Sequence, residues 1–172
     1  MLNIFQLSIL FILGGFLGWF IETANHSIKQ KKFINPGFLK SPHLPVYGFG
    51  IILVYLVSIS NVSFPIKLIL FMISTTSLEL VTGLFLEKIY HIKLWDYENS
   101  FLNYKGIISP SHTFAWLLLS IAFYFLIFPH LSYLFNLTIL KIPTIILIGI
   151  VLTDSIISSY KNIRQFKQKS FK

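Results

Sequence analysis

The stretch IFQLSILFILGGFLGWFIET, residues 4–23, decides the fold of this chain. It is almost wholly apolar, with a single charged side chain, Glu22, near its end. About 20 apolar residues in a helix are long enough to cross a hydrocarbon core of about 30 Å. No basic segment precedes the stretch and no small-residue cleavage site follows it, so we expect a retained membrane helix rather than a signal peptide.

Four further apolar segments predict helices near residues 46–59, 66–89, 113–128 and 143–160, of which the first is short for a membrane span. Of the 172 residues, 55% are apolar and 17% aromatic, which is too apolar for a soluble domain of this length. We therefore predict an all-α, polytopic integral membrane bundle of about five transmembrane helices. It forms a single domain over residues 1–172. The segment 129–142 is either a loop or an interfacial helix.

Basic residues mark the expected orientation of the bundle. Twelve of the fourteen lysines and arginines fall in alternate gaps between the apolar segments, whereas Lys67 and Lys141 lie in the other gaps. Basic residues are retained in cytoplasmic loops, so this distribution predicts an N-terminus outside and a C-terminus in the cytoplasm. The twelve are Lys29, Lys31, Lys32, Lys40, Lys88, Lys93, Lys105, Lys161, Arg164, Lys167, Lys169 and Lys172.

The net charge of +8 also indicates the expected partners. The charges lie in short loops and in the basic tail 161–172, close to the membrane, so we expect anionic lipids at the cytoplasmic face and no nucleic acid. The chain has no cysteine, which excludes disulfides, thiolate metal sites and cysteine nucleophiles.

The segment 32–50 is rich in proline and glycine. These residues break regular helix, so we predict a fixed irregular loop that leads into the second helix. Irregular backbone persists at membrane depth only where protein or water shields it. The structural positions that we assign to this loop are Asn35, Gly37, Pro42, Pro45, Gly48 and Gly50. Gly14 and Gly18 in the first helix predict a close approach by another helix.

Acidic residues inside the predicted helices are the main candidates for function. A charge at the bilayer centre costs at least about 2.5–3.5 kcal/mol, so Glu22, Glu79, Glu87 and Asp154 should face the bundle interior, all in its cytoplasmic half. Glu79 and Glu87 lie about 12 Å apart along one helix face, with Gly83 leaving space between them. The alternative is that each acid is neutralised by a neighbour and only fixes packing.

The gap between the third and fourth helices combines aromatic and polar residues. Trp95 and Tyr97 suit an aromatic belt at the membrane interface, but Asp96 between them, together with Asn103 and Gly106, favours a hydrogen-bonded turn. His112 lies on the same side. The histidine spacings single out no metal, and we predict neither a metal nor a cofactor.

Four blocks of sequence together resemble a known family. They are Gly18-Trp19-x-x-Glu22, a block from Asn35 to Gly50, Glu79-x-x-x-Gly83-x-x-x-Glu87, and a block from Trp95 to Ile108. In this order they are similar to the CmpB-like "putative ABC-transporter type IV" membrane proteins, over residues 14–116. The resemblance implies a permease-related protein of the bacterial cytoplasmic membrane. The chain has Pro36, Ser41 and Glu98 where the family pattern usually has Arg, Gly and Ser.

These observations favour a small permease-like subunit with a polar, acid-lined site. The chain lacks the phosphate-binding motif of ATPases, so ATP hydrolysis would come from a separate subunit, and a homo-oligomer or further membrane subunits would enclose the pathway. One alternative is an intramembrane enzyme or carrier acting on a lipid headgroup or lipid-linked substrate at the cytoplasmic leaflet. Another is an adaptor that uses the basic tail. The candidate site residues are Glu22, Tyr47, Glu79, Glu87, Trp95, Asp96, Tyr97, Asn103 and His112.

Overall fold

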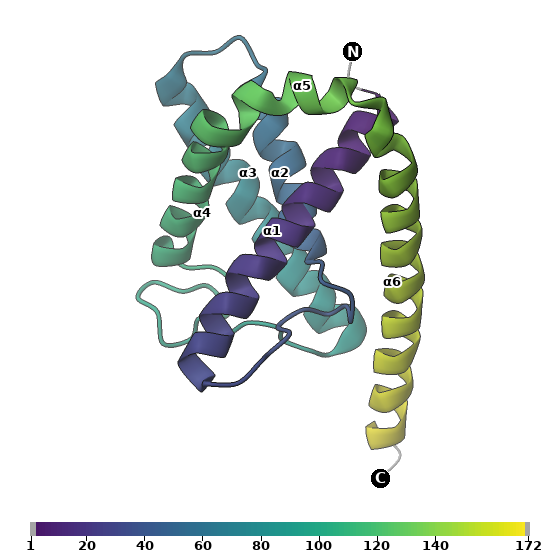
Figure 1. Ribbon diagram of the computed structural model, residues 1–172. Coiled ribbons are helices and arrows are strands. Elements are labelled where there is room, and N and C mark those ends of the chain that lie inside the picture. The colour runs from purple at the N-terminus through teal and green to yellow at the C-terminus, as the bar shows by residue number, and fades with distance from the viewer. Residues whose placement is uncertain (1–2, 171–172) are drawn as a thin grey trace.

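The computed structural model describes the backbone of residues 3–170 and the side chains of residues 3–164. Within this part of the chain the fold is all-helical, with one isolated bridge between Tyr104 and Ile108 and no strand, which confirms the predicted fold class. Figure 1 shows the α-helices α1 (Ile4–Gln30), α2 (Pro45–Ser58), α3 (Phe64–Phe85), α4 (Pro110–Ala122), α5 (Leu131–Asn136) and α6 (Lys141–Ser170).

Four helical stretches are long and apolar enough to cross a membrane, and α2 is a shorter apolar helix of 14 residues. These candidate stretches run over Ile4–Gln30, Phe64–Tyr90, Pro110–Asn136, whose last part is α5, and Thr138–Arg164. The chain is therefore an integral membrane protein. Its two ends lie at opposite ends of the bundle (Figure 1). The assignment of one end to the cytoplasm stays a prediction.

Several helix boundaries differ from the predicted ones. The first helix continues beyond residue 23 to Gln30, where Lys31 adopts the left-handed conformation with φ 52° and ends it. Glu22 therefore lies inside a helix and not at its end. The third helix closes with a π-helical turn, η1 (Leu86–Tyr90). The last helix runs to Ser170, so much of the predicted tail 161–172 continues the helix.

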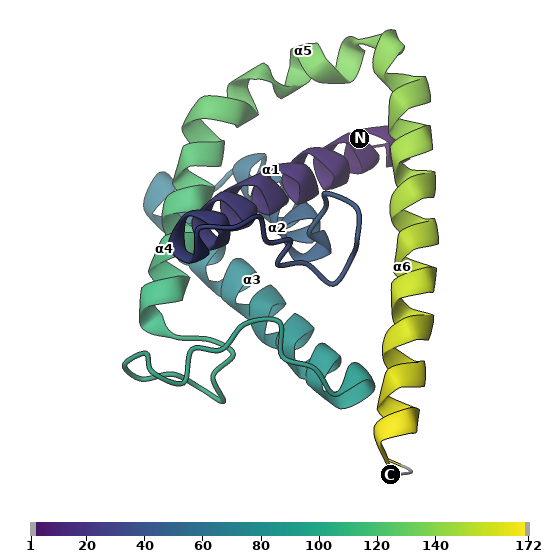
Figure 2. The same cartoon turned by 60° about the horizontal axis from the view of Figure 1, so that its bottom comes forward.

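The segment 129–142, left open between loop and interfacial helix, is mostly helical. Two short 3-10 turns, Phe128–His130 and Thr138–Leu140, flank α5. Pro129 lacks a backbone N–H and so cannot continue the α-helical hydrogen bonding of the preceding helix. Figures 1 and 2 show α5 crossing one end of the bundle from the α4 side to α6. The segment therefore forms a surface helix at the end that carries the N-terminus.

Glycines allow α1 and α2 to pack with their backbones in contact. A Cβ atom at Gly14 would stand 2.7 Å from the carbonyl oxygen of Tyr47, and a Cβ atom at Gly48 would stand 2.7 Å from that of Phe11. At Gly18 a Cβ would meet the Tyr47 side chain at 2.1 Å. The predicted close approach at Gly14 and Gly18 is thus confirmed, and the helix that approaches is α2.

The loop between α1 and α2 returns along α1 to the middle of that helix. The backbone N–H of Leu44 donates to the Gly15 carbonyl at 2.9 Å. Leu39, His43 and Leu44 are buried, and His43 Nε2 lies 3.2 Å from the Phe11 carbonyl. The loop therefore enters the bundle as far as the middle of α1. Since α2 begins at that level, it is shorter than a helix that crosses the whole bundle. Protein shields this irregular backbone, as its depth requires.

A buried lysine closes the hairpin between α2 and α3. Lys67 is 7% exposed, and its ammonium donates to the Ser58 carbonyl at 2.6 Å, at the C-terminal end of α2. The ammonium also lies 5.3 Å from the centre of the Tyr124 ring. A cation at a helix C-terminus interacts favourably with the helix dipole. Lys67 therefore caps α2 from within the bundle.

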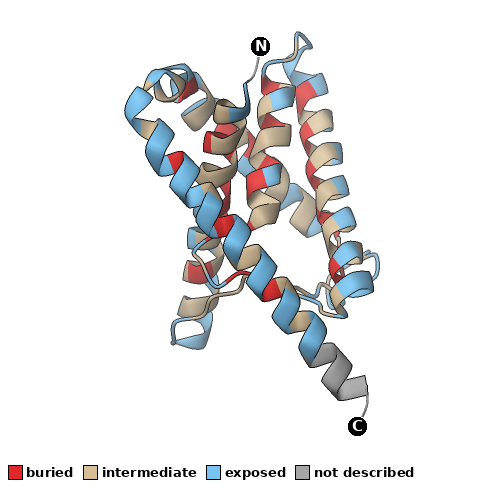
Figure 3. Ribbon diagram, turned by 90° about the vertical axis from the view of Figure 1, so that its right-hand side faces the viewer, coloured by how far each residue is buried: buried red, intermediate tan, exposed pale blue. Residues whose placement is uncertain are grey.

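The core is small, and the outer helix faces are apolar. Leu10, Val54, Phe71, Phe123 and Leu131 form the buried cluster. Figure 3 shows that α6 is mostly exposed, with buried residues along one edge. Of these, Thr144, Val151 and Ser158 lie on a single stripe. A helix that is apolar outside as well as inside is expected of a protein surrounded by lipid.

The glycine contact between α1 and α2 can be tested by thermal unfolding in mild detergent. We expect Gly14→Ala to destabilise the protein by about 1–3 kcal/mol, because the new methyl group collides with backbone that cannot rotate away. Gly149→Ala is the matched control, since no described atom lies within 4 Å of its Cβ position. Equal unfolding midpoints for the two variants would contradict the packing described above.

Candidate functional site

Two tyrosine–glutamate pairs lie in the bundle, one between α1 and α2 and the other between α3 and the loop 91–109. The Tyr47 hydroxyl on α2 donates to Glu22 Oε1 on α1 at 2.5 Å. The Tyr97 hydroxyl, in the loop 91–109, donates to Glu79 Oε1 on α3 at 2.9 Å. Both bonds are of the charge-assisted kind if the carboxyl groups are ionised.

Aromatic rings join the two pairs. The rings of Tyr47 and Trp116 have centres 4.7 Å apart, and Tyr97 stacks on His112 with centres 3.4 Å apart. Both Trp116 and His112 belong to α4. Gly50 permits this approach of α4, since its Cβ position is 3.3 Å from the Trp116 ring. We call Glu22, Tyr47, Glu79, Tyr97, His112 and Trp116 the acid cluster.

The acid cluster contains no lysine or arginine. Among the described side chains, the only ion pair to Glu22 comes from His26, at 3.6 Å, and Glu79 has none. Glu79 is 3% exposed. The Trp116 side chain approaches its carboxyl group, but Oε2 makes no hydrogen bond of good geometry within the described part of the chain. A buried carboxylate in this state is costly unless it binds a proton or another cation.

The loop 91–109 holds Tyr97 by a set of local hydrogen bonds. The Tyr97 backbone N–H donates to the Gly106 carbonyl at 2.8 Å, and the Trp95 indole donates to the Ile107 carbonyl at 2.9 Å. Burial and the neighbouring Glu79 carboxylate raise the pKa of the Tyr97 hydroxyl. Tyr97 therefore stays protonated and available as a donor at neutral pH.

The turn that carries Asp96 is closed by Asn103 and Gly106. The Asn103 side chain donates to the Glu98 carbonyl at 2.9 Å and accepts from the Gly106 N–H at 3.0 Å. Gly106 has φ 68°, and a Cβ there would lie 2.4 Å from Asp96 Oδ1. Asp96 also accepts from the Glu98 N–H. The predicted hydrogen-bonded turn is confirmed, and Asp96 and Asn103 act on Tyr97 only through the loop.

Glu87 does not join the acid cluster. It is exposed and lies on the π-helical turn η1, whose altered hydrogen bonding rotates the side chains that follow α3. Ile107 fills the space beside Gly83, with Cγ2 2.3 Å from the Cβ position. The prediction of open space between Glu79 and Glu87 is therefore wrong, because the loop 91–109 packs into that space.

The loop between α1 and α2 positions the start of α2 and so Tyr47. Asn35 accepts from the Trp19 indole at 3.1 Å and donates to the Leu39 carbonyl at 3.1 Å. The Gly37 N–H donates to the same Asn35 side chain. Pro45 then occupies the first turn of α2, where its missing N–H has no partner to lose. Pro42, in the same loop, is exposed.

Asp154, which was predicted to lie at the same depth as the other acids, is not part of the acid cluster and makes a separate contact. Its carboxylate accepts from both the backbone N–H and the hydroxyl of Ser41, each at 2.7 Å, and from the Ser158 hydroxyl at 3.2 Å. It ties α6 to the loop 31–44. Sequence reasoning missed this pairing because the partners are 113 residues apart and Asp154 lies outside the quoted blocks. It also left Trp116 out of the candidate site.

Comparison with known proteins identifies one family. A family model described as "Putative ABC-transporter type IV" matches residues 9–159. No curated protein and no solved structure matches the chain. Within the described residues, no group of three or more His, Asp or Glu side chains could hold a metal ion.

A double-mutant cycle tests the Tyr97–Glu79 contact. Tyr97→Phe should destabilise the protein by about 1–3 kcal/mol, because it removes the hydrogen bond to a buried carboxyl group. In a Glu79→Leu background the same substitution should cost less, by a coupling energy of about 0.5–3 kcal/mol. Tyr133→Phe, at a tyrosine that is 69% exposed, is the control. An equal cost of Tyr97→Phe in both backgrounds would show that the contact is not formed.

Proposed function

Because the chain belongs to the family described as "Putative ABC-transporter type IV", we propose that it is a membrane-embedded transport subunit whose acid cluster accepts a cation. The described helices support an integral membrane protein. The chain itself has no phosphate-binding motif of an ATPase, so the energy source in this proposal is a separate ATPase subunit. The bacterial cytoplasmic membrane is the proposed location.

The observation that carries the proposal is that, among the described side chains, neither Glu22 nor Glu79 pairs with a lysine or arginine. Two carboxyl groups close enough to interact electrostatically lie in the bundle with tyrosine hydroxyls and aromatic rings around them. Neither has a lysine or arginine within ion-pair distance in the described region. Such groups attract a positive charge from outside the chain, either a proton or a cationic solute.

The two carboxyl groups differ in access. The Glu22 side chain is 30% exposed, whereas Glu79 is buried. A cation would therefore meet Glu22 first and reach Glu79 only after the rings of Tyr47 and Trp116 move. Those rings also offer cation–π contacts to a charge that passes between them. This order defines a short path into the bundle.

The thin bundle supports the proposal of further subunits. Most of α6 is exposed and apolar, and the described part of the chain offers four candidate spans and one shorter apolar helix. Enclosing a pathway would require another copy of the chain or a separate membrane protein. Mass spectrometry of everything that leaves the membrane with the protein in mild detergent would identify these partners. Absence of any ATPase from that sample would contradict the assignment of an ATP-driven subunit.

The cation site can be tested with the purified assembly in liposomes. We expect Glu22→Gln and Glu79→Gln each to lower the influx of protons, Na⁺, K⁺ or ammonium at least about tenfold, which corresponds to a barrier to transport that is higher by about 1.4 kcal/mol. An internal pH dye and isotope uptake measure the fluxes. Glu98→Gln is the control, because this acid is 64% exposed and pairs with Lys93. Full flux in both cluster variants would remove the basis of the proposal.

One contact favours a second candidate function, chemistry on a lipid headgroup or lipid-linked substrate. The buried Ser109 hydroxyl lies 2.7 Å from Nδ1 of His112, whose ring stacks on Tyr97, so an imidazole could activate a hydroxyl there. Under this alternative, cells that carry Ser109→Ala should accumulate the lipid that the parent protein consumes. A lipid profile identical in deletion, Ser109→Ala and parent cells would exclude it.

A further inference from the structure

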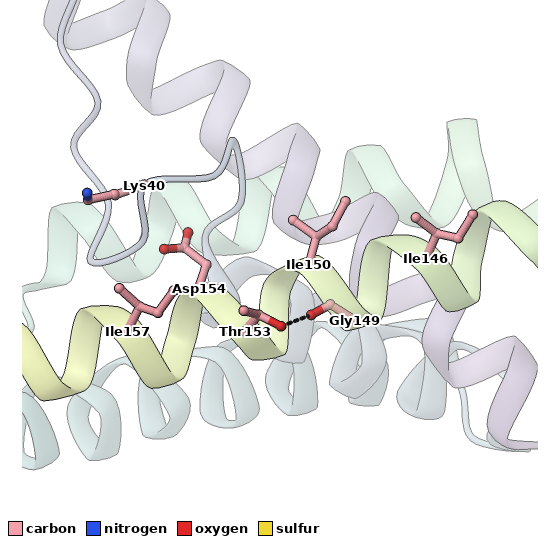
Figure 4. A pocket seen from close by; sticks show the side chains of 7 residues that line it. All are labelled: Lys40, Ile146, Gly149, Ile150, Thr153, Asp154 and Ile157. Atoms are coloured by element: carbon pink, nitrogen blue, oxygen red, sulfur yellow. Dashed lines mark hydrogen bonds between the residues drawn. The ribbon is translucent and has the colours of Figure 1, made fainter.

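A second site lies away from the acid cluster, on the other side of α1 from α4. It is an open groove of 520 Å³ between α6 and the loop 31–44. Figure 4 shows its side chains arranged along α6, with Lys40 from the loop at one end. The groove is lined by Lys40, Ile146, Gly149, Ile150, Thr153, Asp154 and Ile157.

The larger part of the groove is apolar. Ile146, Ile150 and Ile157 form one stripe on α6, and 56%, 50% and 45% of their surfaces are exposed. No described atom comes within 4 Å of the Cβ position of Gly149, so the groove is open beside it. The rise from residue 146 to residue 157 is about 16 Å. This length is close to half of a hydrocarbon core of about 30 Å, which is the depth of one lipid leaflet.

At its polar end the groove is lined by Lys40, and Lys161 of α6 lies just beyond the lining, close to Lys40. Lys161 follows Ile157 by one helical turn, and its side chain lies within interaction distance of Lys40. The Asp154 carboxylate between α6 and the loop is already held by Ser41 and Ser158. Among the described side chains, no acid lies within ion-pair distance of either ammonium group. Two adjacent cations repel each other, and an anion from outside the chain that lies between them relieves this repulsion.

We propose that this groove binds one anionic phospholipid, with its phosphate between Lys40 and Lys161 and an acyl chain along the isoleucine stripe. The charges stand at one end of the groove and the apolar stripe runs from them for the depth of a leaflet, which is the order of parts in a phospholipid. A free phosphate would use only the lysines. In the predicted orientation the lipid belongs to the cytoplasmic leaflet, which is rich in anionic lipids.

Native mass spectrometry of the full chain tests the proposal. The protein is mixed with phosphatidylglycerol, with phosphatidylcholine of the same acyl chains, and with glycerol phosphate. We expect phosphatidylglycerol to bind at least about tenfold more tightly than phosphatidylcholine, a difference of about 1.4 kcal/mol. Glycerol phosphate should not compete. Competition by glycerol phosphate at equal concentration would overturn the lipid assignment in favour of a free-anion site.

Matched variants identify the groups responsible. The double variant Lys40→Gln/Lys161→Gln should lose the preference for phosphatidylglycerol, and Lys40→Arg/Lys161→Arg should keep it. Gly149→Leu should weaken the binding of both lipids, because the leucine side chain enters the groove without a clash. Lys32→Gln, at an exposed lysine of the same loop, should have no effect. An unchanged preference in the Gln double variant, or an equal loss in Lys32→Gln, would overturn the proposal. These outcomes do not depend on the acid cluster.

Discussion

The backbone contact between α1 and α2 is the constraint on which the rest of this structure depends. Helices in lipid gain little from hydrophobic attraction to each other, so close backbone approach at small residues replaces it. Gly14, Gly18 and Gly48 provide that approach. It brings Tyr47 to Glu22, and it leaves room beside Gly15 for the loop 31–44 to return. A side chain at any of these glycines would separate the acid cluster as well as the helices.

Five of the six acids of this chain are stabilised in three different ways. Asp154 is satisfied by neutral donors and serves to fix α6. Asp96 and Glu98 share the exposed Lys93 at the surface, where ion pairs contribute little. Glu22 and Glu79 have only tyrosine donors and, for Glu22, a histidine. The carboxyl groups of Glu22 and Glu79 therefore have the fewest partners that balance their charge. This is why they are the strongest candidates for function.

Much of the fold was predictable from the sequence, because apolar length and composition directly reflect the surrounding solvent. The turn at Asn103 and Gly106 was also predictable, since its residue types encode local hydrogen bonds. Pairing between distant residues was not. Helical spacing placed Glu87 near the face of Glu79, but a π-helical turn, which no residue pattern announces, leaves it exposed. The Ser41–Asp154 contact and the two adjacent lysines depend on how α6 rotates about its axis, which periodicity does not determine.

Lys67 has a consequence for the electrical behaviour of the protein. Its charge is buried against the last carbonyls of α2, where the helix carries partial negative charge of its own. The hydrogen bond offsets part of the cost of burying this charge but leaves the charge itself unchanged. Moving one elementary charge through 100 mV changes its energy by about 2.3 kcal/mol, so the membrane potential acts on Lys67 as it does on any other lysine. Because the Lys67 ammonium is fixed to the end of α2, that force is transmitted to the packed α2–α3 hairpin, whereas the side chain of Lys141 is exposed.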